Sequence, residues 1–106
     1  MMYMPDALDA CINLMQADGS QLIHRNSFNV TAMHFTPAEL AAEIQKHYPD
    51  FTVSYEPDPV RQAIADSWPN YMDDSAARNE WGWNPRYSLP EMVEDMLLHI
   101  RQQYEK

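Results

Sequence analysis

Residues 73–104 read DDSAARNEWGWNPRYSLPEMVEDMLLHIRQQY, and they carry the clearest folding signals in the sequence. Asp73 or Asp74 can cap the N-terminus of a helix that runs to Trp81, because a carboxylate oxygen accepts hydrogen bonds from the free amides of the first turn. Gly82 suits the left-handed conformation that commonly ends a helix. We therefore expect a short helix followed directly by a turn.

Two further helices are predicted by capping boxes, in which Ser or Thr is followed three residues later by Glu. Ser88 begins one box, and apolar residues then recur at helical spacing over residues 89–104. Thr36 begins the other box, with a proline at the first helical position. That helix should end near His47.

The N-terminal part of the chain predicts one more helix. Asp6 is well placed as its N-cap, and Asp18-Gly19 should end it. Its apolar side follows the spacing of an amphipathic helix and consists of Leu8, Cys11, Ile12 and Met15. Cys11 is therefore expected to be a small buried hydrophobe.

Alternating apolar residues predict short strands at Ser27–Met33 and Phe51–Tyr55, and Tyr3-Met4 can end a third. Residues 60–68 fit no clear pattern beyond one short helical turn. The predicted fold class is therefore α+β, with about four helices and two or three short strands. Since so few strands face so many apolar helix sides, the pattern indicates that a larger sheet is missing.

Length and charge exclude several classes of function. The chain has 106 residues, a net charge of −9 and a sequence pI of about 4.6. One domain or part of one fits this length. The acidic balance argues against nucleic acid and against an anionic membrane surface as partners. No apolar run can cross a bilayer, and a single cysteine fits a reducing, cytoplasmic setting.

No self-contained active site is visible in the sequence. Gly19 and Gly82 are the only glycines, so a glycine-rich phosphate loop is absent, and no Tyr-x-x-x-Lys pair occurs. The four histidines form no metal-binding pattern. We expect no catalytic, cofactor-binding or metal-binding residue in this chain. Trp68, in a polar and irregular stretch, is the one aromatic residue with the setting of a ligand contact, although packing is the simpler explanation.

Several motifs together resemble the C-terminal signature of extended short-chain dehydrogenases. Asp73 to Arg78, Trp81 to Pro85 and Ser88-Leu89 match the D-x-S-K-A, L-G-W-x-P and S-L-x-E pattern that nucleotide-sugar epimerases also carry. Tyr3 to Ala7 is similar to the strand-to-helix junction of that superfamily. Two further stretches, Ser27 to Pro37 and Arg61 to Pro69, more closely resemble the short-chain type of L-threonine 3-dehydrogenase.

This resemblance implies that residues 1–106 form a single C-terminal, substrate-side lobe that is not catalytic by itself. Enzymes of this type oxidise the threonine hydroxyl by hydride transfer to NAD, and a separate nucleotide-binding half supplies the glycine fingerprint and the Tyr-Lys pair. The implied partners are that half and a small amino-acid substrate, and a second copy in a homodimer is a further option. The implied substrate-binding residues are Trp68, Ser67 and Arg61.

The sequence is also compatible with two other interpretations. The chain can be a stand-alone protein-interaction module that uses its apolar helix faces, or the equivalent lobe of a nucleotide-sugar epimerase. Epimerases commonly have an Arg-x-Gly-Asp segment for the sugar-nucleotide phosphates. Arg61 to Asp66 lacks that spacing and its glycine, which disfavours the epimerase.

Overall fold

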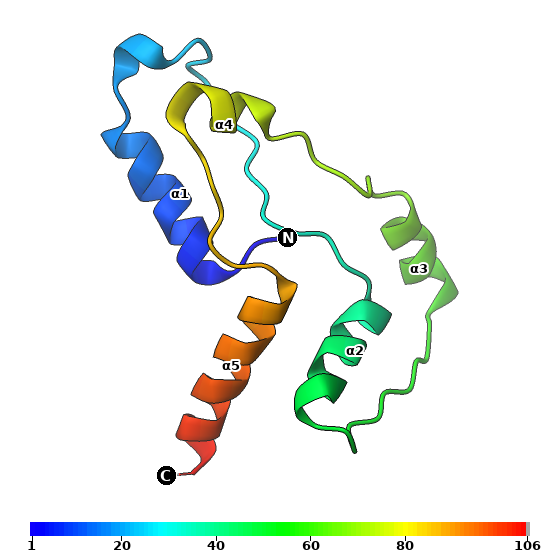
Figure 1. The fold of residues 1–106 in the computed structure, drawn as a ribbon. Coiled ribbons are helices and arrows are strands. Elements are labelled where there is room, and N and C mark those ends of the chain that lie inside the picture. Colours follow the sequence, from blue (N-terminus) through cyan, green and yellow to red (C-terminus); the bar gives the residue numbers. More distant parts are fainter. Residues whose placement is uncertain (106) are drawn as a thin grey trace.

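The computed structural model describes residues 1–105 and shows an all-helical arrangement (Figure 1). The elements in chain order are α1 (Met4–Gln16), the short 3-10 helix η1 (Gly19–Gln21), α2 (Pro37–His47), α3 (Pro59–Asp66), α4 (Ser75–Trp81) and α5 (Leu89–Tyr104). None of the described residues forms a strand. The predicted α+β class is therefore wrong.

The predicted strands are wrong because an extended segment becomes a strand only when a neighbour pairs with it. Ser27–Met33 is extended in part, but its apolar side chains pack on helix α4 and the chain around it rather than within a sheet. Phe51–Tyr55 is a connection with exposed side chains, Tyr55 being 58% exposed. Tyr3 has extended backbone angles, but it is the N-cap of α1 and Met4 already belongs to that helix.

The helix ends confirm some capping predictions and contradict others. The Thr36 box is formed: the Glu39 amide donates to Thr36 Oγ1 at 3.2 Å, and the Thr36 amide donates to Glu39 Oε2 at 2.7 Å. Gly82 ends α4 with φ of 73°, as predicted. The Ser88 side chain makes no capping hydrogen bond, so the second capping box is wrong, although α5 spans the predicted residues 89–104.

Two helix starts differ from the prediction. Helix α1 begins at Met4, so Asp6 lies inside the first turn and is not its N-cap. Helix α3 has eight residues, which is more than the single turn predicted. Asp58 explains this, because its Oδ1 accepts from the amides of Val60 and Arg61 and so satisfies two free donors of the first turn.

The buried apolar core is small and lies where α1, α4 and the extended segment after Ser27 meet. Ala10, Ala77 and Trp83 are buried there, with Phe28 and Trp81 packed against them. The Trp83 indole donates to the Thr31 carbonyl at 3.0 Å, which attaches the turn after α4 to the extended segment. The core therefore joins parts of the chain that are distant in sequence.

The molecule is thin and open. Its extents are 52 × 39 × 20 Å and its radius of gyration is 17.3 Å, where a compact domain of about 100 residues has about 13 Å. Figure 1 shows α2 and α3 on one side and α1 and α4 on the other, with the extended segment running between them. Helices α1, α3 and α5 leave large apolar side chains exposed.

Candidate functional site

The three predicted substrate-binding residues lie together on α3 and at its C-terminal end. The Arg61 amide donates to Asp58 Oδ1 at 3.1 Å as part of the helix cap. Ser67 Oγ donates to the Ile64 carbonyl at 2.6 Å, and the Trp68 amide donates to the Ala65 carbonyl at 3.1 Å. The first bond belongs to the first turn of α3, and the other two close its last turn. Hydrogen bonds between residues close in sequence therefore determine the backbone conformation of this segment.

This segment is exposed on all sides. Helix α3 has no buried residue, and Trp68 is 67% exposed. Val60 and Ile64, at 71% and 53% exposed, stand eight and four residues before Trp68, so the three apolar side chains follow helical spacing. The α3 segment, defined here as residues 58–68, thus presents an apolar stripe next to the polar groups of Arg61 and Ser67.

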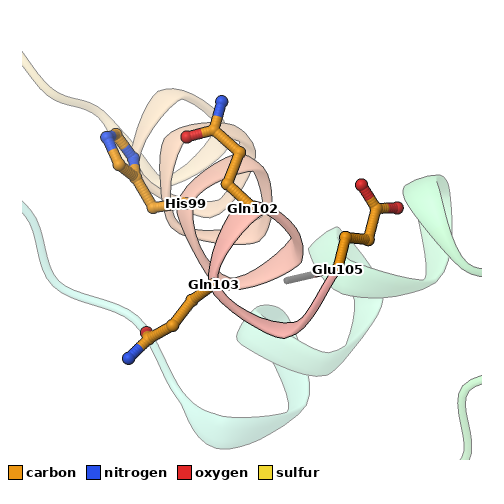
Figure 2. Close-up of a pocket in the computed structure, with 4 residues that line it drawn as sticks. All are labelled: His99, Gln102, Gln103 and Glu105. Carbon is orange, nitrogen blue, oxygen red and sulfur yellow. The ribbon is translucent and has the colours of Figure 1, made fainter.

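Two hollows of the surface lie away from the α3 segment. One is at the end of α5, lined by His99, Gln102, Gln103 and Glu105, whose side chains point away from one another (Figure 2). A second lies between α2 and α5 and is lined by His47, Tyr48, Glu94, Leu97, Leu98 and Arg101. Neither includes Arg61, Ser67 or Trp68.

The described part of the chain has neither a metal-binding cluster nor a membrane-spanning helix. Over residues 1–105, no three His, Cys, Asp or Glu side chains gather in a way that could hold a metal ion. No helix within that range is long and apolar enough to cross a membrane. Cys11 is exposed, so its predicted burial is wrong.

A buried carboxylate that the sequence did not reveal connects α1 to the chain after α4. Asp6 is only 1% exposed, and its two oxygens accept from the amides of Arg86 and Tyr87, each at 3.0 Å. The Arg86 guanidinium also pairs with Asp9, one turn further along α1. Asp6 therefore fixes the direction in which the chain leaves α4 towards α5.

A second buried carboxylate holds the loop after η1 against α4. Glu80 Oε1 accepts from the amides of Ile23 and His24 at 2.6 and 2.8 Å, and Oε2 lies 2.6 Å from His24 Nδ1. Burial by itself raises the pKa of the Glu80 carboxyl, but the donors from His24 and Ile23 outweigh burial, and the pKa lies below its ordinary value. Glu80 is therefore held as a carboxylate.

Asp73 and Asp74, the two acidic residues at the start of α4, have different hydrogen-bond partners. Asp73 Oδ1 accepts from the Ser75 amide at 2.9 Å, which lowers the pKa of Asp73. Asp74 is the N-cap residue of α4, and its side chain makes no capping hydrogen bond. Asp74 is 5% exposed, and its Oδ1 accepts from Arg78 Nε at 2.9 Å. Both residues thus stabilise the start of α4.

Comparison with known proteins shows which class of protein the chain is similar to. No protein-family model matches the chain. An uncharacterized epimerase/dehydratase of Staphylococcus haemolyticus is 58% identical over 102 residues, which are 96% of this chain and 32% of that protein. One of Staphylococcus saprophyticus is 54% identical over 97 residues, 92% of this chain and 30% of that protein. The chain is similar to epimerase/dehydratases and spans about a third of the length of the curated relatives it matches.

Solved structures that are similar to the chain indicate a narrower class. An L-threonine dehydrogenase from Clostridium difficile superposes with a TM-score of 0.91 at 51% identity, over 97% of this chain and 32% of that one. The holo form of a GalE-like L-threonine dehydrogenase from Cupriavidus necator superposes with a TM-score of 0.88 at 53% identity, over 94% and 32%. The chain corresponds to the C-terminal portion of L-threonine 3-dehydrogenases, which confirms the resemblance inferred from the sequence.

Proposed function

We propose that the chain acts as the substrate-binding portion of an NAD-dependent L-threonine 3-dehydrogenase and has no catalytic activity by itself. The observation that carries this proposal is the likeness to threonine dehydrogenase structures over nearly the whole chain. The chain has neither a glycine-rich loop nor a Tyr-x-x-x-Lys pair. NAD and the groups that move the proton and the hydride would therefore come from a nucleotide-binding portion.

The α3 segment is the part of the chain that we assign to the substrate. In the complete enzyme, Trp68 would exclude water above the reacting carbon, which favours hydride transfer. The Arg61 guanidinium is free of ion pairs within the described residues, and it suits the carboxylate of an amino acid. Ser67 Oγ donates to Ile64 but still has lone pairs that can accept from an ammonium group.

The test uses a chimera in which this chain replaces the matching 102 residues of the Staphylococcus haemolyticus relative. We expect the chimera to reduce NAD in the presence of threonine. The chain alone should neither reduce NAD nor bind it. Trp68→Ala should lower kcat/KM for threonine by about 10-fold or more and leave the affinity for NAD within about 2-fold. Tyr55→Ala, which also removes an exposed aromatic side chain, is the matched control.

Two results would contradict the proposal. If Trp68→Ala weakened NAD binding while threonine kinetics held, Trp68 would be a cofactor or packing residue. Turnover by the isolated chain would overturn the proposal as a whole.

The second candidate is the equivalent lobe of a nucleotide-sugar epimerase, because the curated relatives are designated epimerase/dehydratases. The same chimera offered a nucleotide sugar in place of threonine separates the two. Conversion of the sugar nucleotide without threonine oxidation would favour the second candidate.

A further inference from the structure

One side of α5 carries charged and apolar residues in a symmetric order. Glu94 lies at one end and Arg101 at the other, with Leu97 and Leu98 between them. A separation of seven residues is nearly two turns of an α-helix, so the two charged residues lie on the same side, about 10 Å apart along the helix axis. We define the α5 stripe as Glu94, Leu97, Leu98 and Arg101.

The α5 stripe lies at the surface of the chain. It forms one wall of the hollow between α2 and α5, and His47 and Tyr48 at the end of α2 form the other. These two helices lie side by side (Figure 1). Leu98 is 54% exposed and Tyr48 is 46% exposed, whereas the buried residue of α5 is Val93. The hollow is therefore a partly apolar surface that is open to a partner.

The charged ends of the α5 stripe can form further ion pairs. Glu94 has no ion pair with any other of residues 1–105. Arg101 donates from Nε to Glu105 Oε1 at 2.7 Å, but both side chains are about two-thirds exposed, so this pair is weak. The terminal amino groups of the Arg101 guanidinium are donors that this bond does not use.

The order of the α5 stripe is self-complementary when two copies of α5 lie antiparallel. A two-fold axis that passes between Leu97 and Leu98 brings Glu94 of each copy opposite Arg101 of the other, because both lie at the same distance from the axis. A parallel arrangement would instead bring like charges together, which is unfavourable. We propose that a second copy of this chain docks on the α5 stripe in the antiparallel arrangement, with the leucines packed between the two ion pairs.

The net charge and the size of the contact limit the strength of this association. Each copy has a net charge of −9, so the two copies repel one another outside the stripe. Two helix sides and two hollows make a small interface, below the area of about 1,200 Å² that marks the weak end of specific contacts. We therefore expect a dissociation constant on the order of 10–100 µM for the isolated chain.

Charge reversal provides the test. Glu94→Arg places two arginines opposite each other at both ends of the stripe, and Arg101→Glu places two glutamates there. Each variant alone should have a dissociation constant at least about 10-fold higher than that of the wild-type chain. An equimolar mixture of the two variants should associate again, because each arginine then faces a glutamate. Sedimentation equilibrium over a concentration series that brackets the expected dissociation constant is the measurement.

Glu56→Arg is the matched control. It changes the net charge by the same amount as Glu94→Arg, but Glu56 is an exposed residue in the connection before α3. This variant should associate at least as well as the wild-type chain. Circular dichroism of each variant should match that of the wild-type chain, since all three substituted residues are exposed.

Three results would overturn the proposal. The first is a wild-type chain that stays monomeric over the whole series. The second is association of the single variants as tight as that of the wild-type chain, which would indicate a contact through another exposed helix face. The third is a mixture of the two variants that stays monomeric. None of these measurements depends on threonine oxidation, so the association and the proposed function are tested separately.

Discussion

Asp6 is the residue on which the path of the chain around α1 depends most directly. It accepts from two backbone amides that have no other described partner, and both of its oxygens are used. A carboxylate at this position is therefore a structural acceptor rather than a group with chemistry to perform.

Asp6→Ala should lower the free energy of unfolding by about 2–4 kcal/mol, because each unsatisfied donor costs about 1–3 kcal/mol and part of that is recovered by water. Urea unfolding of the chimera, which holds the chain in its proposed setting, gives the measurement. Asp9→Ala is the control, since its ion pair with Arg86 is largely exposed and should contribute less than about 1 kcal/mol. Equal losses from the two changes would contradict the role given to Asp6.

Glu80 predicts how stability depends on acidity. Because the pKa of its carboxyl is lower in the folded chain than in the unfolded chain, the stabilisation is fully present above the unfolded value and is lost as the pH falls through the folded value. We expect the wild-type chain to lose stability below about pH 4.5 more steeply than Glu80→Gln. Thermal unfolding from pH 3 to pH 7 measures this, and parallel curves would disprove it.

At the scale of elements, the two Ser or Thr capping boxes give a matched comparison. Thr36→Ala should lower the free energy of unfolding by about 1 kcal/mol, because it removes the acceptor for the Glu39 amide. Ser88→Ala should cost clearly less, because the Ser88 side chain makes no capping bond. Chemical denaturation of both variants is the measurement, and a larger loss from Ser88→Ala would contradict the structure.

The elements were predictable where the signal is local. The Thr36 box and the left-handed Gly82 depend on residues within one turn, and both were predicted correctly. The strands were wrong because alternation in Phe28 and Val30 also fits a segment that packs on tryptophans. Pairing is a property of the neighbour, and the sequence pattern of one segment does not contain it.

In the candidate site, too, some residues could be named from the sequence and others could not. Trp68, Ser67 and Arg61 came from the resemblance, and the structure places Arg61 on α3 and the other two just after its end, without testing their role. Asp6 and Glu80 were missed, since the partners of Asp6 lie 80 and 81 residues away and Ile23 lies 57 residues from Glu80. No spacing rule spans such separations.

For the whole molecule, the exposed helix faces predict the behaviour of the isolated chain. Each large apolar side chain left in water forgoes about 1.5–3 kcal/mol, while the net stability of a domain is only about 5–15 kcal/mol. The chain should therefore either associate or be marginally folded. Sedimentation equilibrium and thermal unfolding over one concentration series test this. A monomer with a high, concentration-independent melting temperature would support the stand-alone module instead.

The smallest dimension of the molecule, 20 Å, has a thermodynamic consequence. A molecule this thin hides little hydrocarbon from water, and the heat-capacity change of unfolding scales with the apolar area that becomes hydrated. A calorimetric scan of the isolated chain should therefore show a broad, shallow endotherm instead of a sharp peak. Its stability curve should be correspondingly flat, so that cooling would weaken this chain less than it weakens a compact globule of equal length.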